Sequence, residues 1–123
     1  MEYPVVPEHK RIDREQVNVL FVCSRNQWRS PTAERMFKGH PVIVARSAGT
    51  SLSARHRISH ADIGWADVIL VMENKHRDRI VEEYARLVEH TPIHVLDIPD
   101  DYKYMDPELM EVLEQTVEPL LFA

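Results

Sequence analysis

The sequence predicts an α/β fold, a three-layer αβα sandwich in which a four-stranded parallel sheet lies between two layers of helices. Short apolar, β-branched runs alternate with segments of helical periodicity, which is the order typical of parallel strands joined by helices. These runs are continuously apolar, as expected for strands that are buried on both faces. Hydrophobic residues make up 44% of the chain and charged residues 28%, which are ordinary globular values.

We expect one domain, because 123 residues is close to the commonest domain size. Residues 1–16 contain Pro4 and Pro7 and show no clear period, so they are interpreted as an N-terminal extension. Residues 17–123 would then form a single α/β domain. The oligomeric state and the role of the extension stay open.

Four apolar runs are expected to form the strands. They cover residues 17–22, 41–46, 67–72 and 92–96. Between the second and third runs, the stretch that follows Gly49 is polar, with one short helical turn expected over residues 61–65.

Three longer helices are expected. The first covers residues 32–38, with Ser30 as N-cap, Pro31 at the first helical position, Glu34 closing a capping box and Gly39 ending the helix. The second covers residues 75–88, where apolar side chains recur at helical spacing. The last begins at Asp106-Pro107-Glu108, again a cap followed by proline.

The only cysteine, Cys23, lies where the first strand ends and a helix is about to begin. Ligands of parallel sheets bind beyond the carboxyl ends of the strands. The N-terminus of a helix offers unpaired N–H groups and a partial positive charge, which bind anions and favour the thiolate form of a nearby cysteine. We therefore expect Cys23 to be a nucleophile rather than an inert buried side chain.

Arg29, six positions after Cys23, adds a planar fork of donors that can hold two oxygens of a phosphate-like group. With eleven arginines in the chain this spacing alone is weak, and a lone cysteine after a strand is usually inert. Strand, turn and helix start together favour an anion-binding loop with a nucleophile at its floor.

The segment Cys23-Ser24-Arg25-Asn26-Gln27-Trp28-Arg29-Ser30 resembles the signature of the low-molecular-weight protein tyrosine phosphatases: a cysteine, five residues, an arginine, then serine or threonine. Pro31, Ala33 and Glu34 match that family's helix start, and Ser47-Ala48-Gly49-Thr50 matches its next marker. The chain looks most similar to a compact bacterial branch of predicted tyrosine phosphatases, from about residue 17 onward.

The resemblance implies a phosphomonoester hydrolase that needs no cofactor or metal and forms a cysteinyl-phosphate. Cys23 would attack phosphorus, Arg29 and the loop N–H groups would hold the phosphoryl oxygens, and Ser30 would stabilise the thiolate. The remaining residues that would bind the phosphorylated substrate are Ser24, Arg25, Asn26, Gln27 and Trp28.

Two loop residues depart from the family pattern. Arg25 stands where the family usually has glycine, and Trp28 stands where some relatives have a second cysteine. Without that second thiol, oxidised Cys23 has no internal resolving partner. Trp28 is interpreted either as ordinary packing or as a wall of the substrate mouth. The stretch from Thr50 to Asp67 is also shorter than in the classical family, which puts phosphotyrosine specificity in question.

A leaving alkoxide or phenoxide needs a proton, so a carboxylic acid is expected over the loop. The family places this acid in an Asp-Pro-aromatic loop before the last helix. Asp100 has that place, with an aromatic two residues later, whereas Asp106 precedes a proline but is explained by capping the helix. Asp100 is the favoured acid, with Asp106 the main alternative and Asp97 or Asp101 behind it.

The net charge of −5 argues against nucleic acid as the main partner. The charge is divided, because residues 1–60 hold ten Lys or Arg against five acids and residues 61–123 hold five against fifteen. This is either plain solvated surface or a basic half that steers anionic substrates to the loop. The arginines concerned would be Arg25, Arg29, Arg35 and Arg46.

Other classes are disfavoured by what the sequence contains. No apolar run approaches the ~20 residues that span a bilayer, and no segment resembles a signal peptide. One cysteine allows no internal disulfide and no cysteine-based zinc site, which fits a reducing cytoplasm. His56 and His60 have metal-ligand spacing but no matched carboxylate, so no metal is expected.

Two alternative functions remain open. An arsenate reductase could use this loop with a small external thiol. A cysteine phosphocarrier or phosphate-binding module could use a similar strand, loop and helix, although a carrier needs no clamp such as Arg29.

Overall fold

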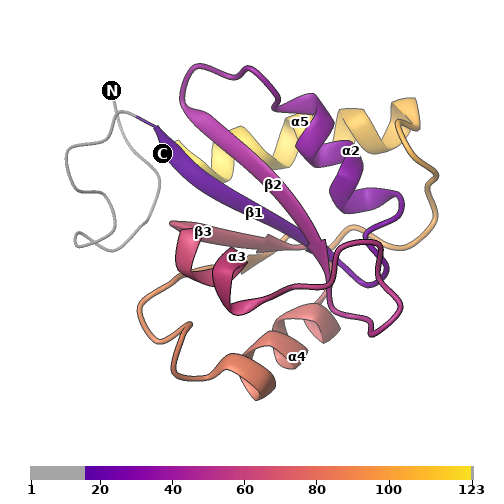
Figure 1. Ribbon diagram of the computed structural model, residues 1–123. Coiled ribbons are helices and arrows are strands. Elements are labelled where there is room, and N and C mark those ends of the chain that lie inside the picture. Colours follow the sequence, from indigo (N-terminus) through magenta and orange to yellow (C-terminus); the bar gives the residue numbers. More distant parts are fainter. Residues whose placement is uncertain (1–15, 123) are drawn as a thin grey trace.

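The computed structural model describes residues 16–122 (Figure 1). The expected extension therefore lies outside the described residues, apart from Gln16. Strands and helices alternate as predicted, and the αβα fold is confirmed. The elements are β1 (Val17–Cys23), α2 (Arg29–Met36), β2 (Ile43–Gly49), α3 (His60–Trp65), β3 (Val68–Val71), α4 (Asn74–Tyr84), β4 (Ile93–Val95) and α5 (Pro107–Leu121).

The four strands form one parallel sheet in the order β2-β1-β3-β4. In Figure 1, α2 and α5 cover one face of the sheet, and α3 and α4 cover the other. The register pairs Cys23 with Gly49 and Val22 with Val71, so three strands end at the same edge. The segments that leave this edge build the site.

The strand β1 is buried on both faces, which explains its continuous apolar run. Val19 and Phe21 belong to the core under α2 and α5, whereas Leu20 and Val22 belong to the core under α3 and α4. All four side chains have no exposed surface, and burying each one stabilises the fold by about 1.5–3 kcal/mol.

The predicted start of α2 is wrong in its details. The helix begins at Arg29 with Trp28 as N-cap, so Ser30 lies inside the first turn and caps nothing. The Ser30 hydroxyl is engaged instead with Cys23, and the Glu34 carboxylate accepts from Ser47 rather than closing a capping box. The side chains of Ser30 and Glu34 therefore stabilise the loop and its surroundings rather than the N-terminus of α2.

The other boundaries differ by a few residues. The helix expected over residues 75–88 ends at Tyr84, and the second strand runs from Ile43 to Gly49 rather than from 41 to 46. The last helix begins as predicted, because the Asp106 side chain accepts from the Glu108 N–H at 2.8 Å. Within residues 16–122, no helix is both long and apolar enough to cross a membrane.

Replacing Gly49 by alanine should destabilise the protein, because a Cβ there would lie 2.5 Å from the Ser24 carbonyl oxygen and 2.9 Å from the Asn26 nitrogen. Both are backbone atoms of the loop after β1, so either strand end or loop must move. We expect urea denaturation to show a loss of about 1–3 kcal/mol in the free energy of unfolding. The control is Gly64→Ala in α3, where an added Cβ meets nothing within 4 Å. This substitution should raise the free energy of unfolding by up to about 1 kcal/mol, because alanine favours the helix more than glycine does. Equal effects of the two substitutions would contradict this explanation.

Candidate active site

A small cavity of about 140 Å³ opens at the end of β1, and Cys23 forms part of its wall. The residues that line it are Cys23, Ser24, Arg25, Gln27, Trp28, Arg29 and Asp100. Of the residues that the sequence predicted for the site, only Asn26 and Ser30 are missing from this lining. Both lie beneath the loop and are buried.

The backbone of the loop has a fixed orientation. The carbonyl groups of Cys23, Ser24 and Arg25 accept from the N–H groups of Thr50, Ser51 and Arg55 at 2.9 to 3.0 Å. Within residues 16–122, no acceptor pairs with any backbone N–H of residues 24–28. The loop carbonyls are therefore hydrogen-bonded to the segment after β2, whereas the loop N–H groups remain available to bind another group. This arrangement is typical of anion-binding loops.

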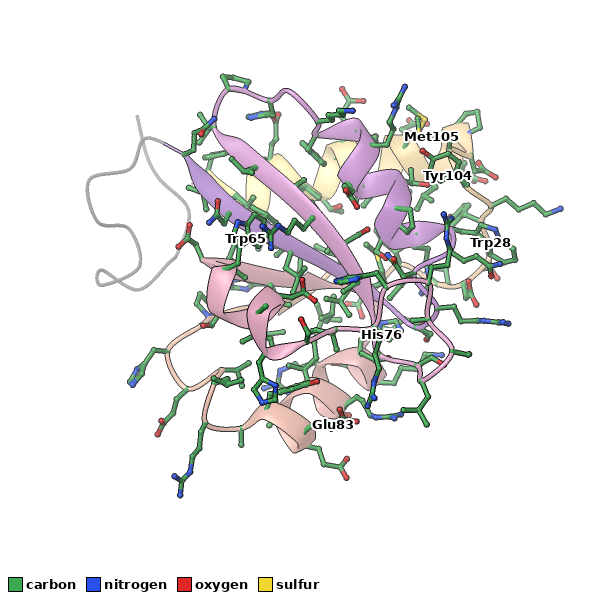
Figure 2. The ribbon with its side chains drawn as sticks, viewed as in Figure 1. Trp28, Trp65, His76, Glu83, Tyr104 and Met105 are labelled. Carbon is green, nitrogen blue, oxygen red and sulfur yellow. The ribbon has the colours of Figure 1, made fainter. Side chains whose placement is uncertain are left out.

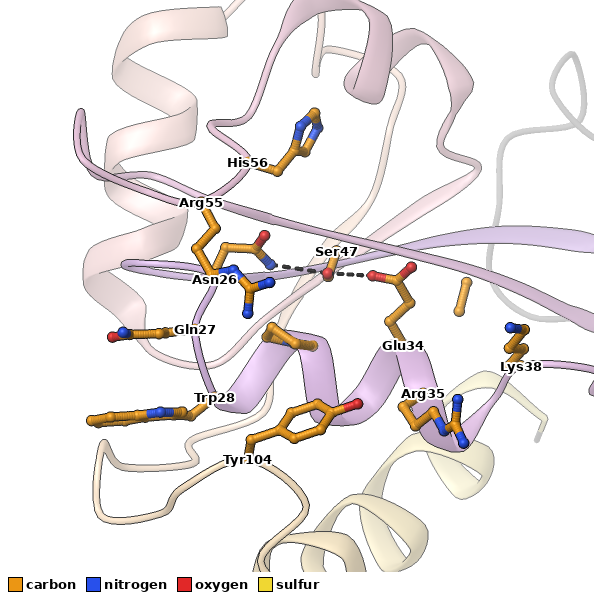
Figure 3. Close-up of a pocket in the computed structure, with 12 residues that line it drawn as sticks. Asn26, Gln27, Trp28, Glu34, Arg35, Lys38, Ser47, Arg55, His56 and Tyr104 are labelled. Atoms are coloured by element: carbon orange, nitrogen blue, oxygen red, sulfur yellow. Dashed lines mark hydrogen bonds between the residues drawn. The ribbon is translucent and has the colours of Figure 1, made fainter.

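Asn26 holds this loop from below. Its backbone is left-handed, with φ of 54°, and its side-chain amide donates to the hydroxyls of Ser30 at 3.0 Å and Ser47 at 2.9 Å. The Ser47 hydroxyl in turn donates to Glu34. The chain of hydrogen bonds, part of which Figure 3 draws, joins the loop to α2 and β2.

The Cys23 sulfur lies 2.9 Å from the Ser30 hydroxyl. Because Asn26 donates to this hydroxyl, the hydroxyl's own proton is available for either the Cys23 sulfur or the Ala48 carbonyl, which is 3.3 Å away. Ser30 can therefore donate to Cys23 whenever that sulfur is a thiolate.

Arg29 is only 2% exposed, and two acceptors fix its guanidinium. Its Nη1 donates to the Glu73 carboxylate and, at 2.8 Å, to the Ile98 carbonyl. The Nε atom lies 3.6 Å from Asp100, which is beyond hydrogen-bond distance. Among the described residues, no hydrogen bond engages Nε or Nη2, so these two donors form a free fork on a side chain that lines the cavity.

Glu73 compensates the buried charge of Arg29. Burial alone would raise the pKa of Glu73, but the hydrogen bond and the positive charge of Arg29 outweigh it and keep the pKa below its usual value. Glu73 therefore stays ionised, and the ion pair is maintained in neutral solution.

A second side-chain contact involves the buried ring of His76, which lies against the partly exposed Ser24. The His76 Nδ1 accepts from the Glu73 N–H at 3.0 Å, so in the neutral ring the proton is on Nε2. Burial, helped by the charge of Arg29, lowers the pKa of His76 to about 4, so the ring is neutral. Nε2 then donates to the Ser24 hydroxyl at 2.8 Å, and that hydroxyl must direct its own proton elsewhere.

The structure separates the candidate acids. Asp100 lines the cavity beside Arg29, whereas the Asp106 carboxylate caps α5. Arg46 lines a separate hollow together with Asn26 of the loop, and its guanidinium stacks on Trp65, 4.2 Å from the ring centroid. Figure 2 shows Trp65 far from Trp28, on the opposite side of the view.

Glu73 and His76 were missed by the sequence analysis. Glu73 lies two residues after β3 and His76 lies in the first turn of α4, and the carboxyl end of β3 lies beside that of β1, so their position in the topology would have been the signal. His56 contacts Asp62 at 2.8 Å. Within residues 16–122, no group of three His, Cys, Asp or Glu side chains could hold a metal ion.

The fold is similar to that of solved low-molecular-weight phosphatases. The YwlE arginine phosphatase from Geobacillus stearothermophilus is 21% identical with a TM-score of 0.64, covering 85% of this chain and 92% of that one. The tyrosine phosphatase Wzb from Escherichia coli K30, in complex with phosphate, is 22% identical with a TM-score of 0.66, covering 85% and 95%. No family model and no curated protein matches the sequence. At these identities the similarity establishes the fold, which is the one that the Cys23 loop predicted.

His76 should make the stability depend on pH. In the unfolded chain histidine binds a proton below about pH 6.5, but folded His76 does so only near pH 4. Protons are therefore taken up on unfolding between these values, and stability falls as the pH drops through this window, by up to about 3 kcal/mol. His76→Asn keeps an acceptor for the Glu73 N–H but does not titrate.

Urea denaturation at several pH values from 7 to 4 would measure this effect. The free energy of unfolding of His76→Asn should fall less steeply than that of the wild type. Parallel curves for the two proteins would contradict a neutral, buried His76.

Proposed function

We propose that the protein is a phosphomonoester hydrolase of the low-molecular-weight tyrosine phosphatase type, acting on phosphotyrosine-like groups through a cysteinyl-phosphate. The observation that carries the proposal is the convergence of Cys23, a row of unpaired loop N–H groups and the free fork of Arg29 on one cavity. Similarity of fold to Wzb and YwlE supports the same chemistry.

In the first step the Cys23 thiolate attacks phosphorus, and the bond from phosphorus to the leaving oxygen breaks. The three other phosphoryl oxygens are held by the loop N–H groups and by Nε and Nη2 of Arg29. These donors are in place before the reaction and stabilise the charge that develops in the transition state.

Asp100 acts as general acid in that step and gives its proton to the leaving oxygen. In the second step the Asp100 carboxylate removes a proton from water, which attacks the cysteinyl-phosphate and releases phosphate and the Cys23 thiolate. Its place on the cavity wall beside Arg29 supports this role, and the cap of α5 sufficiently explains Asp106.

The hydroxyls of Ser30 and Ser24 assist the reaction. Ser30 donates to the thiolate before attack and again when it leaves. Ser24 receives the Nε2–H of neutral His76, so its own proton is free for a phosphoryl oxygen in the cavity that Ser24 lines. His76 is a positioning residue in this scheme.

The proposed substrate class is inferred from the residues at the mouth of the cavity. Trp28 lines the cavity and is 37% exposed, so it offers a ring face to an aromatic leaving group. The neighbours include both a tyrosine phosphatase and an arginine phosphatase. Among these, the ring of Trp28 favours a phosphotyrosine-like substrate.

Cys23→Ser should abolish hydrolysis of phenyl phosphate while inorganic phosphate still binds, because the N–H groups and Arg29 remain. Steady-state kinetics and calorimetric titration with phosphate measure the two properties, and EDTA should not affect wild-type turnover. Retained turnover in Cys23→Ser would remove Cys23 from the mechanism. An inactive wild type that forms a stable phosphocysteine would favour the carrier.

Asp100→Asn should lower kcat/KM, which reports the first step, about 10²- to 10⁴-fold on phenyl phosphate, whose leaving group needs a proton. The loss should be much smaller on 2,4-dinitrophenyl phosphate, whose leaving group departs unprotonated. Asp106→Asn is the matched control, since asparagine caps helices about as well as aspartate. If Asp106→Asn shows the dependence on leaving group and Asp100→Asn does not, Asp106 is the acid.

A further inference from the structure

A groove much larger than the Cys23 cavity runs along α2, and the proposed reaction does not use it. Its volume is about 910 Å³, against about 140 Å³ for the cavity. Gln27 and Trp28 line both, so the groove begins where the cavity ends.

One face of α2 forms the floor of this groove. Trp28, Pro31, Glu34, Arg35 and Lys38 all line it, and they recur every three or four residues as one stripe of a helix. Figure 3 shows this stripe with Arg55 reaching in from the opposite wall. From Trp28, the N-cap, to Met36, the last residue of α2, the helix rises ~12 Å at 1.5 Å per residue, and Lys38 lies in the turn beyond it. That length matches about four residues of an extended peptide.

The groove is positively charged although the chain has a net charge of −5. Arg35, Lys38 and Arg55 line it, and within residues 16–122 no ion pair engages any of them. The one carboxylate in the lining, Glu34, already accepts from Ser47. An occupant that brings negative charge would find three free cations there.

Two aromatic side chains line the groove, and one of them, Trp28, also lines the cavity. Trp28 and Tyr104 are 37% and 50% exposed and line the groove, and Figures 2 and 3 show them on the same side of the molecule. The segment that carries Tyr104 is tied to α2, because the Met105 N–H donates to the Thr32 hydroxyl at 2.8 Å. The wall of the groove that Tyr104 forms is therefore held in place by a hydrogen bond to α2.

We propose that the groove binds the peptide segment next to the phosphorylated residue, and that this segment is acidic. The inference rests on the proposed function for the phosphorylated residue itself. A peptide fits better than a longer polyanion, because residues 61–123 hold fifteen acids against five basic residues and repel negative charge beyond the groove. The cavity then recognises the phosphoryl group, and α2 recognises its sequence context.

The test compares two phosphotyrosine peptides that differ only in about four flanking residues, Asp and Glu in one and Asn and Gln in the other. At low salt the wild type should show kcat/KM about tenfold higher for the acidic peptide, a preference that falls as salt is added. Arg35→Glu combined with Lys38→Glu should remove or reverse the preference. Arg77→Glu combined with Arg86→Glu, on and after α4 across the sheet, changes net charge equally and should keep it.

Two further measurements separate this proposal from the proposed function. Phenyl phosphate is too small to reach Arg35 or Lys38, so its hydrolysis reports on the catalytic loop alone. Binding of the two peptides to Cys23→Ser, measured by calorimetry, reports on the groove without turnover. Equal binding of both peptides, or equal loss of preference in the two double variants, would overturn the groove proposal even if phenyl phosphate is hydrolysed.

Discussion

The buried guanidinium of Arg29 constrains most of the structure around the site. A charge that is only 2% exposed must be compensated, and it is held by Glu73 after β3 and by the Ile98 carbonyl after β4. These partners tie the loop after β1 to the ends of two other strands. Removing Glu73 would leave the buried charge of Arg29 without its counter-charge, so the site and the fold depend on the same contact. The two remaining donors, Nε and Nη2, are oriented as a result.

The loop orientation follows from a second constraint, the close approach of β2. No Cβ fits at Gly49, and the segment after it takes the loop carbonyls as acceptors. Every carbonyl engaged on that side leaves an N–H directed to the other. The loop thereby acquires its anion-binding character from backbone geometry, and Asn26 fixes it with a left-handed residue and two hydrogen bonds. The positive charge of the site is therefore that of oriented dipoles together with Arg25 and Arg29.

The fold and the loop could be predicted because their signals are local. The apolar run before Cys23 and the Asp106-Pro107 cap each depend on a few adjacent residues, and both elements form as expected. The failures involve side-chain partners that the pattern of the predicted elements does not reveal. Arg29 meets residues 44 and 69 positions away, and Ser30 leaves its expected role as N-cap for Cys23 and Asn26. A hydroxyl in a helix start predicts a cap only when no stronger partner lies nearby, and here the turn of the loop brings Cys23 and Asn26, seven and four positions away, to Ser30.

In the proposed function, the cavity at the end of β1 and the groove along α2 divide recognition between them. The cavity of about 140 Å³, lined by the loop and by Arg25 and Arg29, would recognise a phosphoryl group whatever carries it. It contains little that could distinguish one phosphomonoester from another, because N–H donors contact oxygens common to all. Discrimination must therefore come from side chains around the mouth of the cavity, and Gln27 and Trp28 are the two that line both the cavity and the groove. An interaction that is equally strong in the ground state and in the transition state changes KM more than kcat. Contacts between a substrate and α2 should therefore select the substrate without changing the chemical steps at Cys23.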